Sequence, residues 1–327
     1  MTWVRTPSTP PQALVDEIRP GPVRRFRVVA AMVAVGVAGP IVGAVLSDGA
    51  VDRGLVGLVV YDVALAAVAA GIALRSPSRV ELGWFVTLHR VALTARNGTI
   101  IVDYLARTRR WRAYGVVGSV GVAQGISLAS PATHVNGWAI LFAGWFVGGI
   151  LAEVPVGRRH VGGVRVASLQ PRTLSRYLSP GVTGWLLGWA VGTVGVLAVY
   201  GAAVSPLGTR RVVGGAAVRA VVSMVSVWSM LVIVRRPQPA APPDVVAADD
   251  ATRRAAVRRI AAGWGVLQCI EAIVVGQWLS SGPGDDLVAD VGVAACVLGL
   301  VGVLASWLIV PTRMSPPRDT DDRVIVS

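Results

Sequence analysis

Lysine is absent from this chain, so all 31 basic residues are arginines. Charged residues of both signs are also scarce: they make up 15% of the chain, whereas a soluble domain carries about 25%. Hydrophobic residues account for 54% of the chain, and its mean hydropathy is +0.62. This shortage of charge excludes an ordinary water-soluble domain, and we predict an integral membrane protein.

The motifs that would indicate catalysis or metal binding are missing as well. There is no Walker A, HExxH or GxSxG motif, and the three histidines fall in different predicted loops. The two cysteines, Cys269 and Cys296, fall inside predicted spans, which excludes a disulfide framework. We therefore predict no catalytic residues, no metal ligands and no cofactor.

Long apolar runs, by contrast, are abundant. Eight of them approach the about 20 residues that a helix needs to cross the hydrocarbon core of a bilayer. Helices are expected because open strands would leave backbone groups unpaired in lipid. The sequence predicts an all-α, polytopic transmembrane helix bundle with about eight spans. These runs are Val28–Leu46, Gly54–Leu74, Ala113–Ser130, Gly137–Val156, Gly181–Val204, Val212–Val234, Ile260–Leu279 and Leu287–Val310.

The positions of the arginines predict the orientation of the spans. With the N-terminus inside, 27 of the 31 arginines fall in cytoplasmic segments, as the positive-inside rule requires. Both termini are then cytoplasmic, and Met1–Phe26 is too polar and proline-rich to be a signal peptide. This distribution explains the net charge of +13 without a nucleic-acid partner. The basic rims predict contact with anionic lipid on the cytoplasmic face, with docking of a partner protein as the alternative.

The spans divide into two sets of four, which suggests a 4+4 parallel internal repeat. Asp103 and Arg107 before span three have the same spacing as Asp249 and Arg253 before span seven. The predicted organisation is a cytoplasmic N-terminal segment, two membrane halves joined by a basic cytoplasmic connector, and a cytoplasmic tail. Their ranges are 1–27, 28–156, 157–180, 181–311 and 312–327.

Three ionisable residues fall inside predicted spans: Asp62, Arg219 and Glu271. Each lies about 10–12 Å below the predicted outer end of its span, taking a rise of about 1.5 Å per residue. Ser223 extends a polar stripe from Arg219, and Gln268 does the same for Glu271. We predict one intramembrane cluster of these five residues. Either it is a structural ion pair that orders the helices, or it lines a proton or substrate pathway.

Other patterns concern helix packing and the membrane surface. The triple Gly184xxxGly188xxxGly192 predicts close packing of helices within the molecule, with a homodimer interface as the alternative. Val80–Ala95 predicts an amphipathic helix on the inner leaflet, with Trp84, Phe85, Leu88 and Val91 as its apolar residues. The segments 205–211 and 237–247 are expected to be a tight external turn and a flexible loop.

Two short segments, Ala167–Pro180 and Ala248–Arg254, resemble segments of uncharacterised actinobacterial multi-pass membrane proteins. The resemblance implies a bacterial plasma-membrane location and carries no known activity or functional residues. From the residues themselves, a transport-related or permease-like protein, acting alone or within a membrane complex, is the first hypothesis. A non-transporting scaffold or regulatory protein with a basic cytoplasmic face is the alternative, and a membrane-embedded lipid enzyme is a third.

Overall fold

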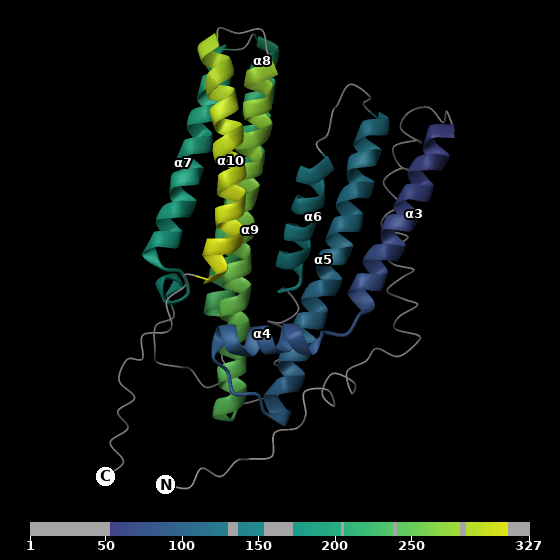
Figure 1. Cartoon of the computed structure of the whole chain (residues 1–327), viewed down its shortest axis with the longest axis vertical. Helices are drawn as coiled ribbons and strands as arrows, with labels where there is room; N and C mark the ends of the chain where they lie inside the picture. Colours follow the sequence, from purple (N-terminus) through teal and green to yellow (C-terminus); the bar gives the residue numbers. More distant parts are fainter. Residues whose placement is uncertain are drawn as a thin grey trace. The chain divides into compact units, whose positions relative to one another are not determined.

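The computed structural model describes residues 53–129, 137–153, 173–203, 206–237, 241–281 and 286–312 (Figure 1). Within these ranges the chain is built of helices joined by short turns, and no strand occurs in them. The predicted all-α fold class is therefore confirmed. The first predicted span, Val28–Leu46, lies outside the described residues.

The chain divides into two compact units, and helix α9 contributes to both. Unit 1 holds four helices of the first half together with α9 as far as Ala256; unit 2 holds the remaining elements and α9 from Val257. The helices of unit 1 are α3 (Arg53–Leu74), α4 (Arg79–His89), α5 (Ala95–Ala129) and α6 (Gly137–Leu151). The elements of unit 2 are the 3-10 turn η2 (Leu174–Arg176), α7 (Pro180–Ala203), α8 (Pro206–Arg235) and α10 (Asp286–Thr312), and α9 spans Pro243–Ser281.

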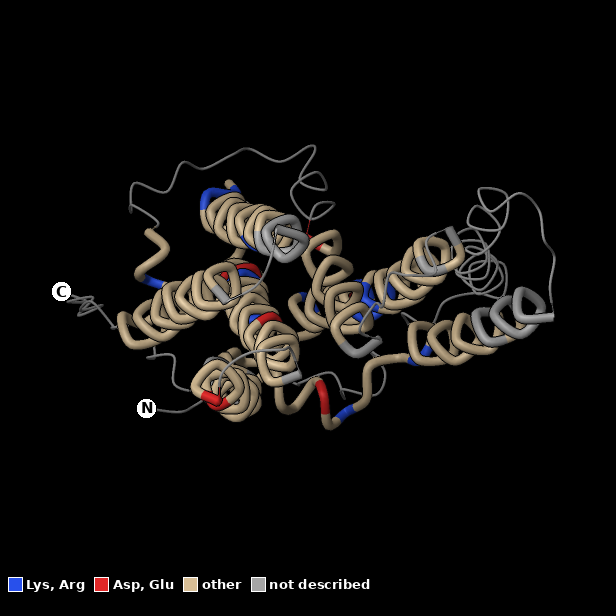
Figure 2. The backbone as a smooth tube through the Cα atoms, turned by 90° about the horizontal axis from the view of Figure 1, so that it is seen from above, with Lys and Arg blue, Asp and Glu red and all other residues tan. Residues whose placement is uncertain are grey.

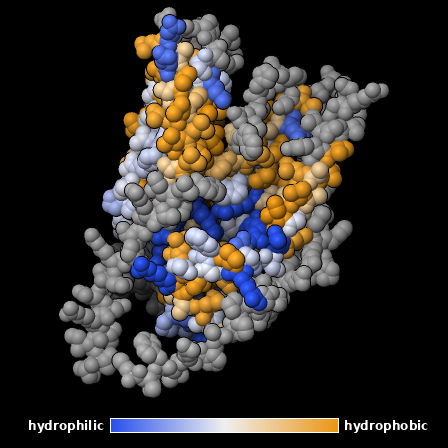
Figure 3. All heavy atoms as spheres, in the orientation of Figure 1, coloured by the Kyte–Doolittle hydropathy of each residue, from blue (hydrophilic) through white to orange (hydrophobic). Residues whose placement is uncertain are grey.

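Four of the described helices are long and apolar enough to cross a membrane: α7, α8, α9 and α10. The number rises to five if α3 and α4, which meet at a bend of 63°, count as one broken span. Hydrophobic residues cover the upper parts of the unit 2 helices in Figure 3. Helices of this length and apolarity are compatible with a membrane protein.

Two of the predicted spans are weaker. Helix α6 is apolar but has only 15 residues, fewer than the about 20 that cross a bilayer. Helix α5 is not among the membrane-capable helices of the described chain. Its first half carries arginines, and Gln124 and Ser127 interrupt the apolar second half. The count of eight spans accordingly stays a prediction.

Prolines mark the beginnings of three helices. Pro180, Pro206 and Pro243 are the first residues of α7, α8 and α9. Proline suits this position because the first amide groups of a helix have no carbonyl partner within it, and because its fixed φ is already helical. The expected turn at 205–211 and the expected loop at 237–247 are therefore largely wrong: both segments run into a helix within a few residues.

Small residues let α5 and α6 approach closely. A Cβ atom on Gly115 would overlap the carbonyl oxygen of Gly144, and one on Gly148 would lie 2.8 Å from the Cα atom of Arg112. The Arg112 guanidinium then stacks over the Trp145 ring, 4.0 Å from its centre. Contact between backbones at this distance is possible only without side chains. The glycines therefore set the separation of this helix pair.

The predicted glycine triple of α7 behaves differently. A Cβ atom on Gly184, Gly188 or Gly192 would meet no heavy atom within 4 Å. In unit 2 the close approach lies instead between α9 and α10, where a Cβ on Gly276 would come within 2.6 Å of the Gly292 carbonyl oxygen. Because only the described ranges can be compared, close packing of the α7 triple within the molecule stays a prediction, and those ranges place no atom against this face.

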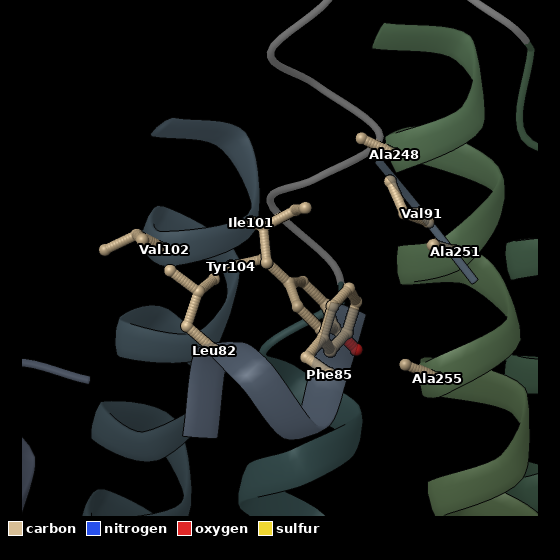
Figure 4. Packing of buried hydrophobic residues seen from close by; sticks show 9 residues of the cluster. All are labelled: Leu82, Phe85, Val91, Ile101, Val102, Tyr104, Ala248, Ala251 and Ala255. Atoms are coloured by element: carbon tan, nitrogen blue, oxygen red, sulfur yellow. The ribbon is translucent and has the colours of Figure 1, made fainter. Parts of the chain in front are cut away.

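Helices α4, α5 and α9 share a small hydrophobic core within unit 1, which we call the α4–α5–α9 core (Figure 4). Phe85 of α4 and Tyr104 of α5 lie with their ring centres 6.2 Å apart, and small alanines of α9 face them. All of these residues are buried. The members of the α4–α5–α9 core are Leu82, Phe85, Val91, Ile101, Val102, Tyr104, Ala248, Ala251 and Ala255.

Hydrogen bonds at the start of α5 fasten this core. The Thr94 and Asn97 side chains each accept a hydrogen bond from the other's backbone amide, which is a helix-capping arrangement. The Thr94 hydroxyl also donates to the Asp244 carboxylate at the start of α9, 2.8 Å away. That hydrogen bond lowers the pKa of Asp244 below its ordinary value. The first turns of α5 and α9 are thus joined by polar contacts as well as by apolar packing.

Candidate functional site

A buried guanidinium lies among the apolar helices of unit 2. Arg219 of α8 is only 7% exposed, and its Nη2 donates to the backbone carbonyls of Ala190 at 2.6 Å and Trp189 at 3.2 Å. It also donates to the Gln268 amide oxygen at 3.4 Å. Its Nη1 donates to the Glu271 carboxylate, also at 3.4 Å. We call this group the Arg219 cluster; it links α7, α8 and α9.

The polar stripes predicted on α8 and α9 face each other. Arg219 contacts Gln268 and Glu271, and about one turn further along, the Trp264 indole donates to the Ser223 hydroxyl at 3.1 Å. Both stripes have a helical period, so side chains on one face of α8 meet side chains on one face of α9. Four of the five predicted cluster residues therefore lie along a single contact between two helices.

The fifth predicted residue is Asp62. It falls in α3, but its side chain lies outside the part that the structure describes. A contact between Asp62 and Arg219 thus stays a prediction. Asp290, a carboxylate near the start of α10, is exposed.

The two members of the ion pair, Arg219 and Glu271, differ in how many hydrogen bonds fix them. Arg219 has four hydrogen-bond acceptors, and two of these are backbone carbonyls whose charge does not change. The Glu271 side chain is 23% exposed, and its contact with Arg219 is long. Buried charges are stable only when paired and hydrogen-bonded. The carbonyls and the Gln268 amide meet the hydrogen-bonding part of that condition, while Glu271 supplies the opposite charge through its long contact.

The cluster lies deep in an apolar stretch. From Arg219 to the end of α8 at Arg235 there are about four helical turns, or about 24 Å. Uncharged stretches make up most of the described tubes in Figure 2, and α8 carries no other charged residue between Arg211 and Arg235. An ionisable pair in such a place either orders the helices or takes part in moving a charged species.

A second charged group was not predicted as a site. Arg253 of α9 is 1% exposed, and it donates to the Asp249 carboxylate and to the backbone carbonyls of Arg236 and Pro237. Arg236 donates to the other oxygen of Asp249 at 3.0 Å. These three charged residues form the Arg253 cluster, which attaches the segment after α8 to α9 inside unit 1. Burial lowers the pKa of Arg236, while the charge of Asp249 opposes that change.

Part of this cluster was visible in the sequence. Asp249 and Arg253 share their four-residue spacing with Asp103 and Arg107, and each pair forms an ion pair on one helix. Only the α9 pair is nearly buried, because Arg236 and the carbonyls after α8 cover it. Sequence spacing predicts the pairs but not which of them is enclosed. The internal repeat that this spacing suggested stays a prediction.

No protein-family model, curated protein or solved structure matches this chain. Within the described ranges, no group of three or more His, Cys, Asp or Glu side chains is placed to hold a metal ion. The two cysteines are free thiols, and Cys269 is buried. The candidate functional sites of the described chain are therefore the Arg219 cluster and the Arg253 cluster.

Proposed function

We propose that this chain is a transport-related, multi-pass protein of the bacterial plasma membrane, with both termini in the cytoplasm. In this proposal the Arg219 cluster is the polar site and Glu271 its proton-exchanging group. The observation that carries it is the difference between the two partners of the ion pair. Two backbone carbonyls accept hydrogen bonds from the Arg219 guanidinium, whereas the Glu271 carboxylate is partly exposed and contacts Arg219 at 3.4 Å.

The physical argument concerns what happens when Glu271 takes up a proton. If Glu271 were the only hydrogen-bond acceptor of Arg219, its protonation would leave the buried guanidinium without any partner, at a large energetic penalty. Because the carbonyls of Trp189 and Ala190 accept from the same guanidinium, Arg219 keeps hydrogen-bond partners in either state. A carboxylate that can change its charge inside an apolar bundle is typical of proton-coupled transport.

The Glu271→Gln variant tests this proposal. Glutamine keeps the size and can still accept a hydrogen bond from Arg219, but it cannot carry an exchangeable proton. In proteoliposomes that contain a pH-sensitive dye, a membrane potential should drive proton flux through the native protein. We expect Glu271→Gln to reduce that flux at least about tenfold, which corresponds to about 1.4 kcal/mol in the barrier.

The matched control is Asp290→Asn, which removes an exposed carboxylate from the neighbouring helix α10. This variant should keep the native flux. If native vesicles carry no more protons than empty ones, or if Glu271→Gln conducts as well as the native chain, the proposal is wrong.

A second candidate, the non-transporting scaffold, rests on the α4–α5–α9 core. Helices α5 and α9 have 35 and 39 residues, more than the about 20 that a membrane span needs. Their first halves carry most of their charges and pack into a core with a buried ion cluster. A folded layer of this kind suits a docking platform on the cytoplasmic face. The scaffold predicts no proton flux in the experiment above.

A further inference from the structure

Helix α4 has two apolar faces, and only one of them is used inside unit 1. Leu82 and Phe85 belong to the α4–α5–α9 core, and His89 is buried beside Phe85, with ring centres 4.5 Å apart. On the opposite face lie Val80, Trp84 and Leu88, spaced four residues apart, so they form a single stripe along the helix. Trp84 is 70% exposed, and its two neighbours in the stripe are exposed as well.

The position of α4 limits what can cover this stripe. Only four residues, 75–78, separate α4 from α3, and they span at most about 14 Å when extended. Helix α3 itself exposes large apolar side chains as far as Ile72, close to its end. Helix α4 therefore follows, past a bend of 63°, a helix that also exposes large apolar side chains, and the two together are apolar enough to form one broken span.

The composition of α4 indicates how deep it lies. It has 11 residues, or about 16 Å of helix, which is about half of the hydrocarbon thickness. It includes Arg79 and Glu81, and Arg109 of α5 pairs with that carboxylate. A short helix with charged residues in its first turn and an exposed tryptophan is typical of the boundary between headgroups and acyl chains.

We propose that α4 lies in the membrane–water interface, with Val80, Trp84 and Leu88 inserted among the acyl chains of the leaflet at the inner end of α3. The occupant of the exposed stripe is thus lipid. The exposed arginines at the two ends of the helix, Arg79 and Arg90, contact anionic headgroups. In this arrangement Val80, Trp84 and Leu88 contact lipid. Phe85 and Val91, which the amphipathic sequence pattern placed on the same apolar face, belong instead to the α4–α5–α9 core.

Spin-label accessibility tests the proposal directly. Single cysteines are placed at Val80, Trp84 and Leu88 on a background carrying Cys269→Ala and Cys296→Ala, labelled with a nitroxide, and reconstituted in phosphatidylcholine vesicles. Because all three positions are exposed, the labels should leave the fold intact. We expect a collision ratio of oxygen to a water-soluble nickel chelate several-fold higher at these positions than at Arg96→Cys, an exposed site in the first turn of α5.

The alternatives give different results. High nickel accessibility at position 84 would place the stripe in water, and low accessibility to both reagents would mean that a second copy or another protein covers it; either result overturns the proposal. Adding phosphatidylglycerol should raise the oxygen-to-nickel ratio at position 84 further. An Arg79→Gln, Arg90→Gln double variant should lose that increase, and an unchanged response would overturn the role of the arginines.

Discussion

Replacing Arg253 by alanine is expected to destabilise unit 1 by about 1–3 kcal/mol for each buried acceptor that loses its donor, the usual cost of an unsatisfied buried hydrogen-bonding group. Arg253 is almost fully enclosed, and it holds Asp249 and two carbonyls after α8. Without it, Asp249 keeps Arg236 as its charged partner in the Arg253 cluster, and the carbonyls of Arg236 and Pro237 lose their donors. Lysine should rescue the variant poorly, because it cannot supply the same fork of donors.

The neighbouring residue Arg254 provides the control for the Arg253→Ala variant. Arg254 also pairs with an aspartate one turn earlier, Asp250, at 2.8 Å, but both side chains are partly exposed. Such pairs contribute about 0.3–0.5 kcal/mol, so Arg254→Ala should change stability little. Unfolding of the detergent-solubilised protein by dodecyl sulfate, followed by far-UV circular dichroism, measures both variants. Equal shifts for the two substitutions would contradict a special role for the Arg253 cluster.

Replacing Gly148 by leucine is expected to force α5 and α6 apart. The added side chain would overlap the backbone of α5 at Trp111 and Arg112, and backbone atoms cannot give way as a side chain can. Overpacking typically destabilises by about 1–3 kcal/mol and sometimes by more. The expected result is a lower midpoint in the same unfolding experiment, together with loss of the stacking of Arg112 on Trp145.

The α7 glycines supply the comparison. Gly188→Leu adds the same side chain to a helix face where the described residues place no atom within 4 Å. It should therefore change the free energy of unfolding by less than about 0.5 kcal/mol, as other surface substitutions do. If Gly188→Leu proved as damaging as Gly148→Leu, the α7 face would be packed after all. Size-exclusion chromatography of that variant would then show whether a second copy had covered it.

The helices themselves could be predicted from the sequence because apolar runs of this length leave few alternatives in a membrane. The contacts of Arg219 with Gln268 and Glu271 followed the helical period of the two stripes, so they too could be predicted. The starts of α8 and α9 could not be predicted in this way. Proline commonly breaks a helix, so Pro206 and Pro243 suggested a turn and a loop, but each occupies the first position of a helix.

Other features depended on three-dimensional packing. A glycine spacing is the same whether a helix packs against it or not, so the pattern could not distinguish Gly148 from Gly188. Phe85 and Trp84 are adjacent in sequence and equally apolar, but one faces the α4–α5–α9 core and the other is exposed. The enclosure of Arg253 depends on carbonyls contributed from the segment after α8.

The central claim is that the apolar part of α9 crosses the membrane and separates a cytoplasmic first half from an external end. Labelling of single cysteines by a membrane-impermeant maleimide tests this claim, at Ala247 near the start of α9 and at Asp286 at the start of α10, both exposed. In intact cells Asp286→Cys should react and Ala247→Cys should not, and both should react once the membrane is permeabilised. Reaction of both positions from outside, or of Ala247→Cys alone, would contradict the account.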